Sequence, residues 1–296
     1  MLIMEMTSHF CGLLENIEPD PDNVKLARKS HEEVRYLLAG DDEISKANPE
    51  TFLSGSYARE TAINNIKDVD IILIIDLDRN ISEPEVTLAW VQASLYNNYS
   101  KVKRQGRSVN VINDKGFSLD IVPATPVSNR SGPLWIPDRE AKTWVSTHPK
   151  AQIEFSSERN KGTEGYYVHL IKIIKYWRDR LTDESAKPNS YIIESLISKC
   201  LTSKPSSYGD AVKNILSYIN FIYQSYLTIG KVPSISDPGY ASVNVAKRWE
   251  FDEFSAFMTE VKNSYYVAKE ALESKDEGES IKLWGKLFGR KFLAPG

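Results

Sequence analysis

The sequence has few of the residues that build metal clusters, disulfide scaffolds or membrane spans. Its 296 residues include two cysteines, Cys11 and Cys200, and four scattered histidines, none at a metal-ligand spacing. Two cysteines so far apart provide no disulfide framework, which favours a reducing compartment. No apolar run reaches the roughly 18 residues of a transmembrane helix, and residues 1–20 lack the basic start and apolar core of a signal peptide. We therefore expect a cytoplasmic protein without a membrane span.

The chain also lacks an excess of positive charge. It has 37 Lys and Arg against 40 Asp and Glu, a net charge of −3. Proteins that grip long nucleic acid are usually basic, so we expect no stable binding of that kind. The local exception is a basic cluster, Lys101, Lys103, Arg104 and Arg107. This cluster is either a solvated face or a rim that attracts nucleotide phosphates or an activating polyanion.

The most informative sequence pattern lies in residues 51–76. Gly55-Ser56 follows an apolar lead-in, and Asp68-Val69-Asp70 opens an apolar, β-branched run of strand length. Side chains alternate along a strand, so Asp68 and Asp70 point to one face of it. Two carboxylates there repel each other, and a divalent cation such as Mg²⁺, which usually pairs with substrate phosphates, removes the conflict. Gly55 lets the backbone approach a phosphate, and the Ser56 hydroxyl can donate to it.

Two further features add to this site. A helix beginning within residues 57–63 would place its N-terminus where an anion is favoured. Residues 107–124 alternate as a hairpin around a turn at 113–116, and Asp120 lies on the face opposite its apolar neighbours. Asp120 is either a solvent-facing residue of an edge strand or a third metal ligand beside Asp68 and Asp70.

Gly-Ser, a spacer of about ten residues and acid-x-acid before a strand together resemble the signature of the DNA-polymerase-β-like nucleotidyltransferases. In that superfamily a single acid on a later, adjacent strand completes the site. The resemblance therefore implies that Asp68, Asp70 and Asp120 are catalytic residues that hold two Mg²⁺ ions, for which Mn²⁺ can substitute. It implies that Gly55 and Ser56 bind the nucleotide phosphates.

The second half of the chain reads as mostly helical. We expect an α+β fold: a polymerase-β-like core with a mixed sheet and flanking helices in residues 1–160, a helical lobe in 161–296, and the active site in the cleft between them. The N-terminal helix is expected to pack behind the core. The expected helices lie at 22–39, 82–96 (with a capping box from Ser82 and Glu85), 165–181, 191–201, 208–229, 243–273 and 279–288.

Two helical stretches narrow the resemblance. YVHLIKIIKYW and KPNSYIIESL are similar to the second lobe of cyclic GMP–AMP synthase, oligoadenylate synthase and the bacterial cGAS/DncV-like synthases (CD-NTases), which make cyclic oligonucleotides in antiphage signalling. The similarity covers most of residues 20–230. It implies that Lys175, or Lys172 one turn earlier, binds the triphosphate, that Ser190 touches the triphosphate and that Tyr191 stacks on a base. The plainer alternatives are helix-face lysines, an N-cap serine and a core tyrosine.

The resemblance thus implies a template-independent enzyme that joins ATP and other NTPs into a cyclic di- or trinucleotide second messenger and releases pyrophosphate. The expected partners are an effector protein reached through the product and a regulatory protein. The zinc-binding insertion of cyclic GMP–AMP synthase has no counterpart here, which counts against activation by nucleic acid. Alternatives are a tRNA- or RNA-tailing enzyme and an enzyme that transfers AMP to a protein or small molecule. A degenerate binding module would usually lack one of the acids.

Overall fold

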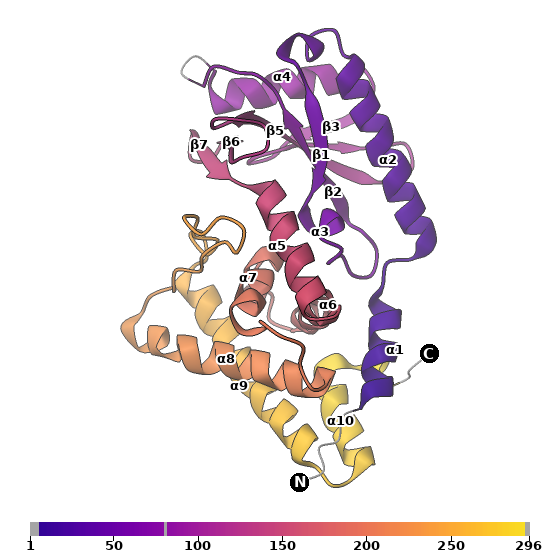
Figure 1. Ribbon diagram of the computed structural model, residues 1–296, viewed down its shortest axis with the longest axis vertical. Helices are drawn as coiled ribbons and strands as arrows, with labels where there is room; N and C mark the ends of the chain where they lie inside the picture. Colours follow the sequence, from indigo (N-terminus) through magenta and orange to yellow (C-terminus); the bar gives the residue numbers. More distant parts are fainter. Residues whose placement is uncertain (1–5, 80–81, 294–296) are drawn as a thin grey trace. The chain divides into compact units, whose positions relative to one another are not determined.

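The computed structural model describes residues 6–79 and 82–293 (Figure 1). They form two compact units, one of residues Pro19–Glu154 and one that combines the described residues up to Glu18 with those from Phe155 onward. This division differs from the predicted one, which ends the first domain at residue 160 and includes the N-terminus in it. No helix in either described range is long and apolar enough to cross a membrane.

The unit of residues 19–154 is built on a mixed sheet. Among the described residues the sheet has seven strands, with the order β1-β2-β5-β4-β3; β6 pairs with the last two residues of β5, and β7 pairs with β6. Only the β2–β5 pair is parallel among the pairs that the structure describes. The strands are β1 (Glu50–Ser54), β2 (Asp68–Ile74), β3 (Lys101–Arg104), β4 (Val109–Ile112), β5 (Ser118–Pro126), β6 (Leu134–Asp138) and β7 (Thr143–Thr147).

Helices α2 (Pro21–Gly40) and α4 (Pro84–Tyr96) pack on the sheet. Their buried side chains share one core with Val69, Ile71 and Leu73 of β2, so the prediction of a helix packed behind the strand is confirmed. The capping box predicted at Ser82 and Glu85 is wrong. Pro84 fixes the first helical position, and the N-cap residue Glu83 makes no side-chain cap.

The basic cluster divides between two roles. Arg104 pairs with Glu85 at 2.5 Å, and Arg107 pairs with the buried Asp138 at 2.8 Å. The exposed Lys101 and Lys103 lie on β3, the last strand of the sheet order. Charged side chains on an outer strand discourage pairing with the edge of another sheet.

Residues 125–160 contain the β6–β7 hairpin and α5 (Pro149–Gly162). Pro137 lies inside β6 and Pro149 is the first residue of α5, so these prolines do not mark turns here. The small elements of the sheet unit are η1 (Ser45–Ala47) and α3 (Gly55–Ala58).

The other unit is helical, so the predicted α+β class is confirmed. Its helix α1 belongs here because the buried Phe10 makes ring contacts with Trp284, Phe288 and Phe292 at 5.0 to 5.8 Å. The elements are α1 (Thr7–Ile17), α6 (Tyr166–Asp179), η2 (Glu184–Ala186), α7 (Ser190–Cys200), α8 (Tyr208–Ile229), α9 (Phe251–Glu273), α10 (Glu277–Phe288) and α11 (Arg290–Leu293).

Helix α9 begins later than the predicted residue 243. Residues 231–250 instead form a loop that two side chains hold together. Asp237 accepts backbone hydrogen bonds from Gly239 and Tyr240, and Asn244 accepts them from Ile235 and Ala246. Local side-chain acceptors of this kind compete with helix formation.

The two thiols should differ in reactivity. Cys11 is exposed, whereas Cys200 donates to the α7 carbonyl of Ile197, and burial raises the pKa of its thiol to about 12. Because the thiolate is the reactive form, a disulfide reagent at pH 8 should modify one thiol per folded chain quickly and the second only in denaturant. Cys11→Ser should remove the fast phase. Two equally fast thiols would contradict this assignment.

Candidate active site

Three carboxylates gather on one face of the central strands. Strands β2 and β5 pair in parallel with Asp70 opposite Asp120, and Asp68 lies two residues before Asp70 on the same face of β2. All three side chains are half-buried. Strand β5 has β2 and β4 as neighbours, so Asp120 is on an inner strand and the edge-strand interpretation is wrong. The sheet therefore brings together the three acids that the sequence singles out.

Gly55 lies directly against one of these acids. The antiparallel β1–β2 register places Ser54 opposite Asp70, so the next residue turns over that carboxylate. Gly55 has φ 67°, and a Cβ atom there would lie 1.7 Å from Oδ2 of Asp70. Glycine is thus required at position 55 for two reasons: the backbone has a positive φ, and the Asp70 carboxylate occupies the space of a side chain.

The predicted helix within residues 57–63 is not formed. Helix α3 has four residues, Gly55–Ala58, and Glu60 already has φ 59°. Ser56 lies in this single turn, and its carbonyl accepts a hydrogen bond from the backbone N–H of Thr61 at 2.9 Å. Any anion binding here would depend on local N–H and hydroxyl groups rather than on the dipole of a long helix.

The positive charge near Asp70 does not balance the negative charge of the neighbouring acids. Burial, together with the negative charges of Asp68 and Asp120, raises the pKa of Asp70 to about 7, and the positive charge of Arg59 opposes this rise. Burial also raises the pKa of Asp120, against a hydrogen bond from Asn110. No three His, Cys, Asp or Glu side chains in the described part of the chain are placed to hold a metal ion on their own. Carboxylate oxygens are nevertheless the protein ligands that suit Mg²⁺, which usually takes its remaining ligands from water and substrate phosphates.

Two residues near the acids, Asn110 and Arg59, are not predicted from the sequence. Asn110 of β4 stands opposite Asp120, and its amide donates to the Asp120 carboxylate at 3.0 Å. The apolar alternation of the predicted hairpin, Val109 and Val111 on one strand and Leu119 and Ile121 on the other, leaves Asn110 and Asp120 on the polar face, so Asn110 could have been found from that pattern. Arg59 is 9% exposed and lies near Asp70. No spacing rule singles it out, because its position depends on the turn after Gly55.

The two candidate lysines are both ion-paired within the helical unit. Lys175 of α6 is 4% exposed, and its ammonium lies 3.9 Å from the carboxylate of the equally buried Glu194 of α7. Lys172 donates to both carboxylate oxygens of Glu18 at 2.6 and 2.7 Å. A buried ammonium stays charged only with such a partner.

Ser190 and Tyr191 open α7, next to the Lys175–Glu194 pair. The N-cap is Asn189, whose side chain accepts from the N–H of Ile192, so the prediction of Ser190 as N-cap is wrong. The hydroxyl of Ser190 accepts from Arg178 at 3.0 Å, one helical turn after Lys175. The phenol of half-buried Tyr191 donates to Asp237 at 2.7 Å. Arg178–Ser190 and Lys175–Glu194 are thus successive links between α6 and α7.

Asp70 should destabilise the metal-free protein at neutral pH. Its pKa rises from 3.8 to about 7 on folding, so the folded state holds the proton more tightly and stability falls as pH rises between these values. In EDTA at pH 8, Asp70→Asn should therefore unfold several degrees above the wild type, and the gap should narrow at pH 5. Calorimetry with the exposed Asp114→Asn as control tests this. A variant that is no more stable at pH 8 would disprove the repulsion.

The comparisons with known proteins agree with this geometry. Residues 4–160 match the model of the Second Messenger Oligonucleotide or Dinucleotide Synthetase domain, and residues 154–266 match that of the cGAS/DncV-like nucleotidyltransferase C-terminal helical domain. A cyclic AMP-AMP-AMP synthase of Acinetobacter sp. is 32% identical, over 98% of this chain and 86% of that protein. A probable cyclic AMP-AMP-GMP nucleotide synthase of Salmonella paratyphi B is 26% identical, over 99% and 93%.

Solved structures share the fold. The E. coli CdnC protein in a complex with HORMA-deltaN superposes with a TM-score of 0.79 at 19% identity, over 98% of this chain and 99% of that one. Vibrio cholerae DncV superposes with a TM-score of 0.62 at 14% identity, over 99% and 87%. The predicted polymerase-β-like core with a helical second lobe is thereby confirmed. Such enzymes typically use divalent metal ions, which suits the acid-rich strand face. With both family models matched along the chain and a relative 32% identical over nearly all of it, this protein belongs to the cGAS/DncV-like nucleotidyltransferases.

Proposed function

We propose that this nucleotidyltransferase joins NTPs, with ATP as a main substrate, into a cyclic oligonucleotide that acts as a second messenger in antiphage signalling. The observation that carries the proposal is the three acids, Asp68, Asp70 and Asp120, on one strand face under Gly55. The choice of ATP is supported by relatives named cyclic AMP-AMP-AMP synthase and cyclic AMP-AMP-GMP synthase.

Asp68, Asp70 and Asp120 would hold two Mg²⁺ ions. Bound Mg²⁺ would offset the repulsion between carboxylates and triphosphate and would make the acceptor ribose hydroxyl easier to deprotonate. Gly55 leaves room for the backbone to approach the donor triphosphate, and Ser56 would donate to it. Asn110 holds the Asp120 carboxylate in place. Attack of the ribose oxygen on the donor α-phosphate, with departure of pyrophosphate, then depends mainly on positioning.

The helical unit would complete the nucleotide site. Lys175 is the better candidate for the triphosphate, because Glu194, 3.9 Å away, keeps its buried ammonium charged. Lys172 is the weaker candidate, since its ammonium already donates two short hydrogen bonds to the carboxylate of Glu18. Ser190 would bind a phosphate oxygen. Tyr191, whose hydroxyl Asp237 fixes, would stack on a base, a contact worth about 1–3 kcal/mol.

A regulatory protein and a separate effector are part of the proposal. The E. coli neighbour was solved in complex with a HORMA protein, and another structure of it contains ATP. A protein regulator would suit this chain, whose net charge of −3 does not favour activation by long nucleic acid.

The decisive experiment supplies purified protein with the four labelled NTPs and Mg²⁺ or Mn²⁺, followed by phosphatase and mass spectrometry. A phosphatase-resistant product with the mass of a closed di- or trinucleotide is expected, and Asp68→Asn/Asp70→Asn should abolish it. Each Asn variant removes a charged ligand while keeping the shape of the side chain. Label transferred instead to added tRNA or protein would favour an RNA-tailing or AMP-transferring enzyme and overturn the proposal.

Gly55 should matter through Asp70 and not through backbone strain alone. Gly55→Ala should lower product formation by about a hundredfold or more, because the new Cβ displaces the Asp70 carboxylate. The matched control is Gly116→Ala in the β4–β5 turn, since Gly116 has φ 78° but a Cβ atom there would have no neighbour within 4 Å. Gly116→Ala should lower the melting temperature and leave activity largely intact. Equal losses of activity in both variants would disprove the role of the Asp70 contact.

A further inference from the structure

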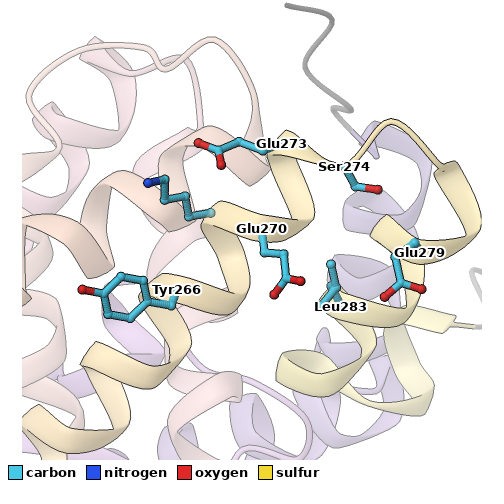
Figure 2. Close-up of a pocket in the computed structure, with 7 residues that line it drawn as sticks. Tyr266, Glu270, Glu273, Ser274, Glu279 and Leu283 are labelled. Atoms are coloured by element: carbon cyan, nitrogen blue, oxygen red, sulfur yellow. The ribbon is translucent and has the colours of Figure 1, made fainter.

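A groove runs between the C-terminal part of α9 and α10, within the helical unit (Figure 2). Its volume is about 460 Å³. Glu270, Glu273 and Glu279 contribute carboxylates to it, and those of Glu270 and Glu279 lie on either side of Leu283 in the view of Figure 2. Tyr266 and Lys269 line it as well. The groove thus combines an apolar floor residue with three acids and one base.

The negative charge of this groove is not balanced by the fold. Glu270 and Glu273 have no ion-pair partner in residues 6–79 and 82–293, and Glu279 has only a loose, exposed pair with Lys282 at 3.9 Å. The last turn of α9 contains no basic residue. A helix C-terminus carries a partial negative charge, so acids there gain nothing from the helix dipole. These glutamates therefore add little to folding.

An aromatic strip leads into the groove from α8. Phe221 of α8 is 53% exposed and meets Tyr265 of α9 edge-on at 5.7 Å. Tyr265 contacts Tyr266 at 5.1 Å, and Tyr266, also 53% exposed, lines the groove. Exposed aromatic side chains beside a hollow are typical of protein interfaces, where they supply contact area at low entropic cost.

We infer that this surface, the aromatic strip Phe221–Tyr265–Tyr266 with the acidic groove of α9 and α10, docks a segment of another protein that carries arginine or lysine flanked by apolar residues. The cationic head would lie between Glu270 and Glu279, whose carboxylates lie on either side of Leu283 (Figure 2). The apolar neighbours would cover the exposed rings. The charge complementarity identifies the occupant, because an acidic or purely apolar segment would leave these carboxylates unpaired.

The test measures fluorescence anisotropy of a short labelled peptide rich in arginine and leucine with the full chain. Matched peptides replace arginine by glutamate or leucine by serine. The basic apolar peptide should bind, and each replacement should weaken binding by about tenfold or more. Glu270→Lys and Tyr266→Ser should each weaken it by a similar factor, and all of these variants should still form product from NTPs.

The control is Glu15→Lys. Glu15 is an exposed glutamate in the last turn of α1, so the change in net charge and helix position is the same, but it does not line the groove. This variant should bind the peptide as the wild type does. The inference is overturned if Glu15→Lys weakens binding as much as Glu270→Lys does, which would indicate unspecific attraction, or if the glutamate peptide binds equally well.

Discussion

The parallel pairing of β2 with β5 is the interaction on which the site depends. It places Asp70 opposite Asp120, whereas a shift of one residue would turn the acids of one strand to the other face. The register is held from both sides of the sheet. Val69, Ile71 and Leu73 are buried under α2 and α4, and Ile72 and Ile74 are buried with residues of β6.

This pairing forces together charges that the fold does not neutralise. The apolar residues that alternate with the acids fix the strand strongly enough to tolerate the burial and mutual repulsion of the acids, which together raise the pKa of Asp70. Gly55 then brings backbone, rather than a side chain, against the same carboxylate. Stability and chemistry thus make opposite demands on neighbouring residues of one strand, as is common where a site binds a charged ligand.

Much of this could be predicted from the sequence, because the signals are local. Asp68 and Asp70 precede an apolar run, and the hairpin at 107–124 presents Asp120 by simple alternation. The resemblance supplied the expectation that the two segments lie on adjacent strands, and the parallel direction of their pairing was not predicted. The predictions that were wrong concern helix starts, where competing local interactions decide the outcome. Helix α4 begins at Pro84, and the N-cap of α7 is Asn189 rather than Ser190. Hydrogen bonds to Asp237 and Asn244 stabilise a loop where the start of a helix was predicted.

That loop has an implication for how such an enzyme can change. Asp237 accepts hydrogen bonds from the Tyr191 phenol and from two loop amides, so the loop and the tyrosine ring share one anchor. Substitutions in residues 231–250 that move this anchor also move the ring, without altering any acid on the sheet. Under the proposed stacking of Tyr191 on a base, the loop is a place where evolution could change the choice of base without changing the acids on the sheet.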